Sequence, residues 1–269
     1  AVGPYVEEKA ADDFKETQAP QSWMPILKSL EHEGLRFHFG TWLVKEEPDC
    51  ILVEWDGAWD HLDELKGALW NEYHVDTLHS GDDLHSPLLF SYAVARLIQE
   101  LEKHGLVKQR TTVVHAHEWL TGYTNLFLHL WGSSLSTVFT THATMLGRTV
   151  SGIEGYLYEK LGTFDPESKA KELGVNDKHS SEGAAARESD VFTTVSEITA
   201  RECEALHGRN PDVLVLNGLD VENFPSFEEA SLSHRKHRAT IRDFLSYTFF
   251  PHYTFDTAHN LTYLFKGRE

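Results

Sequence analysis

Residues 111–122 of the chain read TTVVHAHEWLTG. A run of β-branched residues ends there in two histidines, a carboxylate and a tryptophan, and an amphipathic segment follows over 121–131. β-Branched residues favour strands, and in an open α/β sheet ligands bind beyond the carboxyl ends of parallel strands. The stretch therefore predicts a strand whose end brings His115, His117 and Glu118 to a ligand.

Two later segments repeat this pattern. Residues 138–141 run into His142, and residues 191–195 run into Ser196. Helical spacing separates the three strands, which is the rhythm of βαβ units. The sequence therefore predicts an α/β fold with a Rossmann-like parallel sheet flanked by helices, and one site built from successive strand ends.

Hydrophobic spacing predicts the remaining elements. Ser22 is expected to cap a helix that Gly34 ends, and a further helix is expected to open near Pro87 and to end at Lys103. Residues 7–21 lack apolar periodicity and are expected to form a surface loop. The other expected elements are strands over 35–43, 50–55 and 213–216 and helices over 60–70, 156–161, 182–187, 199–207 and 232–245.

Composition limits the class of protein. The 269 residues carry a formal net charge of -18, which argues against nucleic acid and anionic membranes as partners. Local basic groups can still bind a phosphate. No apolar run approaches the roughly 20 residues that span a bilayer. Cys50 and Cys203 lie far apart without metal-ligand spacing, which favours a reducing, cytoplasmic setting.

The two ends predict a fragment of a larger fold. Residues 1–5 have the character of the tail of a strand and its turn, and residues 260–269 have that of a strand that begins another unit. We therefore expect an N-terminal lobe over 1–225 that lacks its first strand. Residues 226–269 are expected to form a connector and the first strand of a second lobe.

His115 and His117 allow three interpretations. Their i, i+2 spacing places both on one side of a strand, so a metal could use them with His142 or Glu118 as a third ligand. Alternatively, they are packed histidines that bond to a carbonyl. A third possibility is contact with substrate hydroxyl groups, because imidazole both donates and accepts hydrogen bonds.

Two weaker candidates lie near the C-terminus. Asn217 and Gly218 follow the strand expected over 213–216, where they form either a tight turn or part of a ligand site. Arg268 follows an apolar stretch and is either solvated or a phosphate-binding group. The basic run 234–238 has the pattern of the wet face of a helix, and an anion site is the alternative.

At these same residues the chain resembles the glycogen synthases of the animal and fungal type, which belong to glycosyltransferase family 3. The most specific block is FTTHATMLGR over 139–148, close to the family's F-T-T-H-A-T-L-L-G-R. The other matching blocks are GPY at 3–5, FGTWL at 39–43, KGALW at 66–70, HAHEWL at 115–120, VFTTVSEITA at 191–200, NGLD at 217–220 and GRE at 267–269. The resemblance covers essentially the whole chain.

The resemblance implies the N-terminal, acceptor-side lobe of a retaining glucosyltransferase of the GT-B fold. It implies transfer of glucose from UDP-glucose to the non-reducing end of an α-1,4-glucan, without a metal or another cofactor. His117 would then lie beside the transferred glucose, Asn217 would line the cleft between the lobes, and Arg268 would bind the nucleotide phosphates. The other substrate-binding residues implied by these blocks are His115, Glu118, His142 and Gly218.

The resemblance also sets limits. The family's first strand, and the lysine that would partner Arg268, would lie outside the chain, so we expect the fragment alone to transfer little or no sugar. The expected partners are an α-glucan and a nucleotide sugar, with no nucleic acid and no membrane; a homo-oligomer is compatible with the sequence. The alternatives are another retaining GT-B glycosyltransferase and a glucan-binding module without activity.

Overall fold

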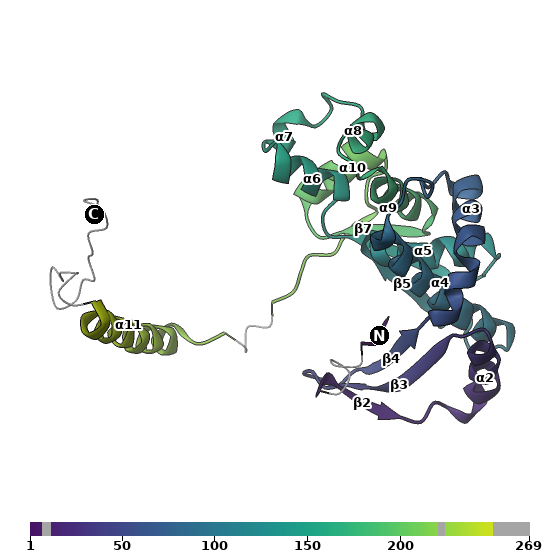
Figure 1. The fold of residues 1–269 in the computed structure, drawn as a ribbon, viewed down its shortest axis with the longest axis horizontal. Coiled ribbons are helices and arrows are strands. Elements are labelled where there is room, and N and C mark those ends of the chain that lie inside the picture. The colour runs from purple at the N-terminus through teal and green to yellow at the C-terminus, as the bar shows by residue number, and fades with distance from the viewer. Residues whose placement is uncertain (7–11, 220–223, 250–269) are drawn as a thin grey trace. The chain divides into compact units, whose positions relative to one another are not determined.

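The computed structural model describes residues 1–6, 12–219 and 224–249 (Figure 1). Contacts between Cα atoms divide the chain into two compact units, Ala1–Leu216 and Asn217–Glu269. The first unit holds the two sheets and eleven of the helical elements described below. The second contributes α11 (Phe227–Phe249), which contains the helix expected over 232–245 and extends it at both ends.

The first four strands form a mixed sheet with the order β1-β4-β3-β2. Its strands are β1 (Val2–Pro4), β2 (Phe14–Thr17), β3 (Arg36–Trp42) and β4 (Asp49–Glu54). β1 runs parallel to β4, whereas β3 is antiparallel to both of its neighbours. The prediction of a surface loop over 7–21 is therefore wrong at Phe14–Thr17, which form a strand. Three of the four residues of this edge strand are polar and exposed, so it has no alternation that a sequence pattern would reveal.

The next four strands form a fully parallel sheet with the order β5-β6-β7-β8. Its strands are β5 (Val113–His117), β6 (Ser136–Thr141), β7 (Val191–Thr194) and β8 (Val213–Leu214). Helices connect them, so the prediction of an α/β fold with a parallel sheet flanked by helices is confirmed. The N-terminal strands, which pair separately and partly antiparallel, depart from a single parallel sheet.

The first unit contains the expected helices, with two corrections, and further helices over 145–153 and 166–172 that were not expected. α2 (Met24–His32) receives no side-chain cap, so the capping role of Ser22 is wrong. α4 (Asp82–Lys103) begins at Asp82, before Pro87, which lies inside the helix. The others are the 3-10 helices η1 (Gln21–Trp23) and η2 (Asp56–His61), and α3 (Leu62–Tyr73), α5 (Glu118–Leu130), α6 (Met145–Ile153), α7 (Leu157–Lys160), α8 (Pro166–Glu172), α9 (Asn176–Glu188) and α10 (Glu197–His207).

The largest hydrophobic core joins α2, α3, α4 and α5. A smaller core lies where Phe139 of β6 and Phe192 of β7 stack at 5.9 Å and meet small side chains of α9. Close approach is essential there, because a Cβ on Gly122 of α5 would lie 2.6 Å from the Cβ of Ala185. This packing fixes α5 and α9 against the parallel sheet and so fixes the ends of β5 and β6. No helix in the described ranges is long and apolar enough to cross a bilayer.

Candidate functional site

His115 and His117 lie on the same side of β5. Side chains alternate along a strand, so Ala116 between them points the other way and is buried, whereas both histidines are exposed. Their rings stack with centroids 4.1 Å apart. The expectation that the two histidines share one side of a strand is therefore confirmed.

The turn from β5 into α5 holds His117 in place. The His117 N–H donates to Thr121 Oγ1 at 2.7 Å, and the Thr121 hydroxyl donates to the His117 carbonyl at 2.6 Å. The next residue, Glu118, has φ 63°, which few residues other than glycine adopt. The sharp turn places the Glu118 side chain directly beyond the strand end.

The end of β6 brings His142 to the same place. His117 pairs in register with Thr140, two residues before His142. His117 Nδ1 lies 3.3 Å from His142 Nε2, so one ring donates a hydrogen bond to the other. His115 Nε2 lies 2.7 Å from Thr140 Oγ1. Three imidazoles predicted from separate strand ends thus form one cluster.

Glu118 links this cluster to the loop and helix that follow β6. Its Oε1 accepts a hydrogen bond from the His142 backbone N–H at 2.9 Å and lies 3.4 Å from Arg148 Nη2. Burial raises the pKa of the Glu118 carboxyl. The contacts make Glu118 a group that fixes the position of His142.

Electrostatics favour neutral rings at the exposed strand end. Although both side chains reach solvent, partial desolvation lowers the pKa of His115, and partial desolvation together with the neighbouring imidazoles lowers the pKa of His117. A neutral imidazole carries one donor and one acceptor, which suits the hydroxyl groups of a sugar. Within the described part of the chain, no group of three or more histidine, cysteine or acidic side chains is arranged to hold a metal ion. The expectation that no metal takes part stays a prediction.

Two buried carboxylates support the loop that carries His142. Glu182 of α9 accepts hydrogen bonds from Thr141 Oγ1 at 2.5 Å and from the Met145 N–H at 2.9 Å. Glu202 of α10 accepts one from Thr144 Oγ1 at 3.0 Å. Neither glutamate was expected at the site, because each lies in a helix distant in sequence.

The remaining predicted residues are not placed beside this cluster. Asn217 and Gly218 are exposed residues of the second unit, whose position relative to the first is not determined. Arg268 lies outside the described residues. The basic run 234–238 is exposed on α11, in agreement with the expected wet face. The roles assigned to all seven predicted site residues stay predictions.

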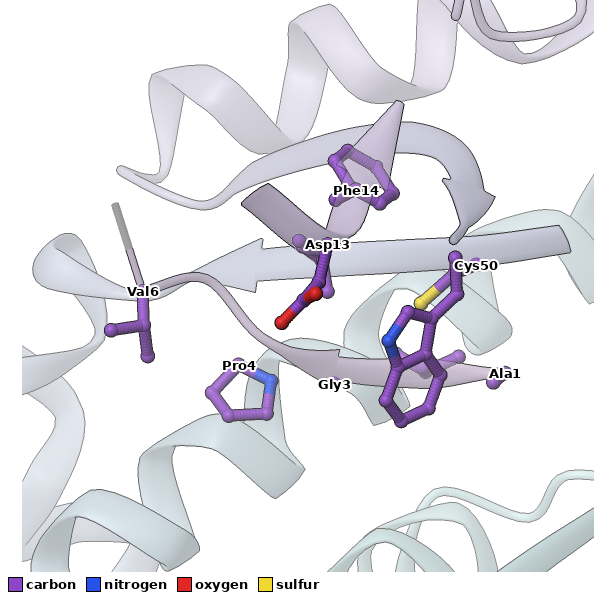
Figure 2. A pocket seen from close by; sticks show the side chains of 10 residues that line it. Ala1, Gly3, Pro4, Val6, Asp13, Phe14 and Cys50 are labelled. Carbon is purple, nitrogen blue, oxygen red and sulfur yellow. The ribbon is translucent and has the colours of Figure 1, made fainter. Parts of the chain in front are cut away.

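A cavity of about 360 Å³ lies on the mixed sheet, away from the histidine cluster (Figure 2). Figure 2 shows Pro4, Phe14 and Cys50 around it, together with the carboxylate of Asp13. The walls are largely apolar, and none of the clustered histidines contributes to them. This cavity therefore does not belong to the candidate site.

Comparisons with known proteins show the family to which the chain is similar. The family model described as glycogen synthase matches residues 1–269. The glycogen [starch] synthase of Neurospora crassa is 31% identical over 268 residues, covering 99% of this chain and 38% of the fungal protein. The glycogen [starch] synthase isoform 2 of Saccharomyces cerevisiae is 33% identical over 277 residues, covering 99% of this chain and 39% of the yeast protein. The liver glycogen [starch] synthase of Mus musculus is 31% identical over 268 residues, covering 99% of this chain and 38% of the mouse protein. The chain thus spans well under half the length of these relatives.

Proposed function

Because this chain belongs to the glycogen synthase family, we propose that it supplies the acceptor-side half of a retaining glucosyltransferase. In this proposal the whole protein transfers glucose from UDP-glucose to the non-reducing end of an α-1,4-glucan. His117 contacts the transferred glucose, and His115 and His142 bind neighbouring hydroxyl groups.

One observation carries the proposal: His115, His117 and His142 converge at the carboxyl ends of two adjacent parallel strands. Ligands of open α/β sheets bind in this position. Lowered pKa values keep His115 and His117 neutral. One nitrogen of each ring is paired with Thr140 or His142, and the other nitrogen can donate to or accept from a sugar hydroxyl. Glu118, Glu182 and Thr121 hold the two strand ends before substrate arrives, and such preorganisation is a main source of catalysis.

The proposal includes no cofactor and no metal. Charge stabilisation of the departing diphosphate is assigned to Arg268 with a lysine from the rest of the protein. Asn217 and Gly218 are assigned to the face of the cleft that meets the second lobe. A cytoplasmic location is proposed as well; it is supported by the two cysteines, which are both buried and unpaired.

A chimera tests the function directly. This chain would replace the matching segment of the Saccharomyces cerevisiae isoform 2 protein, which aligns with 99% of it. Transfer of radiolabelled glucose from UDP-glucose to glycogen is expected, whereas the 269-residue chain alone should transfer little or none. An inactive but correctly folded chimera would contradict the proposal.

The same assay separates the alternatives. A chimera that uses another nucleotide sugar in preference to UDP-glucose would indicate a different retaining glycosyltransferase. Glycogen retention of the 269-residue chain in affinity electrophoresis, combined with an inactive chimera, would indicate a glucan-binding module. Sedimentation of the chain and of the chimera would test whether this segment supports a homo-oligomer.

A further inference from the structure

A second cavity, of about 670 Å³, lies among α8, α9, α10 and the end of α3. It is separate from the histidine cluster of the candidate site, because its walls come from other residues. Its lining includes a tryptophan, two cationic residues, two histidines and a glycine: Trp70, Lys171, Arg187, His179, His207 and Gly183.

Two buried histidines at this cavity have an unsatisfied ring nitrogen. The Nδ1 atoms of His179 and His207 find no hydrogen-bond partner among the residues that the structure describes. The two residues are only 5% and 9% exposed, and their rings stack with centroids 4.9 Å apart. Buried polar atoms in folded proteins are nearly always paired, so a ligand that pairs these nitrogens would complete the structure.

The two nitrogens offer opposite hydrogen-bonding roles. His207 Nε2 lies 3.0 Å from Glu182 Oε2. Burial alone would raise the pKa of Glu182, but hydrogen bonds led by His207 lower it, so the carboxylate accepts the Nε2 proton. In the His207 tautomer whose single ring proton is on Nε2, Nδ1 is an acceptor. Burial and the neighbouring His207 lower the pKa of His179 to about 4, so His179 is neutral at pH 7 and can donate from Nδ1.

Two cationic side chains line the same cavity. Arg187 and Lys171 are exposed, and the side chain of neither makes a hydrogen bond or an ion pair within the described ranges. The acidic groups on the wall compete little: Asp76 accepts hydrogen bonds from Asn176 and His79, and Glu167 is exposed. In a chain with a net charge of -18, two cations without a partner facing one cavity indicate an anionic ligand.

Gly183 shows how these groups converge. A Cβ added there would lie 3.2 Å from Arg187 Nη1 and 3.2 Å from His207 Nδ1. Arg187 Nη1 and His207 Nδ1 therefore both border the bare helix surface at Gly183. Since the Arg187 side chain is exposed, it can turn aside and admit a small ligand.

We propose that this cavity binds a singly protonated phosphate group, either as the free ion or at the end of a phosphate monoester. Its oxygens accept from Arg187, Lys171 and the Nδ1–H of His179. Its hydroxyl donates to Nδ1 of His207. This pattern of acceptors and one donor fits hydrogen phosphate, whereas sulfate at neutral pH has no hydroxyl to donate.

Calorimetric titration of the 269-residue chain with inorganic phosphate, in a phosphate-free buffer at pH 7, tests the proposal. We expect saturable binding with a Kd of about 1 mM or tighter. Sulfate should bind at least about tenfold more weakly, because the His207 nitrogen then stays unpaired. Titration with glycerol phosphate shows whether a monoester or the free ion is preferred; either preference supports a phosphate site.

Two charge-matched variants provide the control. Arg187→Gln should weaken phosphate binding about tenfold or more, while Arg110→Gln, at an exposed position outside this cavity, should leave it unchanged. Circular dichroism would verify that both variants fold. Equal binding of sulfate, equal effects of the two variants, or no saturation by about 10 mM phosphate would overturn the proposal. None of these outcomes depends on glucosyl transfer, so this site and the proposed function fail separately.

Discussion

His117 lies where β5 ends, and its ring meets two other imidazoles. We predict that His117→Ala lowers kcat/KM for glucosyl transfer by the chimera about a hundredfold, because under the proposed function it removes a preorganised hydrogen-bonding group from beside the reacting sugar. Steady-state kinetics with UDP-glucose and glycogen measure this change. His61→Ala, an exchange on η2 outside the cluster, should have little effect. Equal losses in the two variants would argue against a role for His117 in the reaction.

Glu118 acts through the backbone of His142. Glu118→Ala leaves the His142 N–H without its partner, so we expect it to lower the free energy of unfolding by about 1–3 kcal/mol. Glu118→Gln retains an acceptor oxygen and should cost less than about 1 kcal/mol. Urea denaturation of both variants measures the difference, and equal costs would show that this hydrogen bond contributes nothing.

His179 should make stability depend on pH. Its pKa in the folded chain is about 4, mainly because of burial, whereas an unfolded histidine titrates near 6.5. Between these values the unfolded chain binds a proton that the folded chain does not, so stability falls as the pH falls. The loss from pH 7 to pH 5 is about 2 kcal/mol.

The measurement compares urea unfolding of the natural chain and of His179→Gln at pH 7 and pH 5, without phosphate. The glutamine variant should lose about 2 kcal/mol less over this interval. If both proteins lose the same stability, His179 titrates normally and is accessible to water.

At the scale of the elements, the contact between α5 and α9 is the tightest test of packing. Gly122→Ala would place a Cβ 2.6 Å from that of Ala185, which cannot rotate away. We expect a loss of about 1–3 kcal/mol from overpacking. Gly67→Ala, in α3, meets no atom within 4 Å and should stabilise the chain by about 0.4–1 kcal/mol. Thermal unfolding of the pair checks the opposite signs; a neutral Gly122→Ala would mean that the helices separate easily.

Elements with strong local signals could be predicted from the sequence. The β-branched runs before His115, His142 and Ser196 became β5, β6 and β7. β2 could not be predicted, because its pairing with β3 is set by a neighbour in space and not by its own apolar pattern. Pro87 was misleading: a proline suits a first helical turn, yet α4 accommodates it further in and gives up one backbone hydrogen bond.

The candidate site could be predicted only in part from the sequence. Histidines at strand ends can be recognised, since parallel strands bring their carboxyl ends together. Glu182 and His207 could not be, because they meet through the packing of α9 against α10 and have no shared local motif. The same reason hid the second cavity, whose groups come from four helices.

For the whole molecule, the division after Leu216 suggests that the first unit folds alone. We predict that a chain ending at Leu216 unfolds in one transition, with a midpoint within about 4 °C of that of the 269-residue chain, because the shift would correspond to about 1 kcal/mol or less. Differential scanning calorimetry compares the two. A much lower midpoint would show that the second unit stabilises the first.

The contrast between the two sheets has a kinetic consequence. β3 and β4 are antiparallel neighbours joined by residues 43–48, so their pairing closes a short loop. β5, β6 and β7 can pair only after intervening helices have formed, and such distant pairings are slow. During synthesis the hairpin can therefore form early, while the strand ends that carry the histidines come together only once most of the chain has been made.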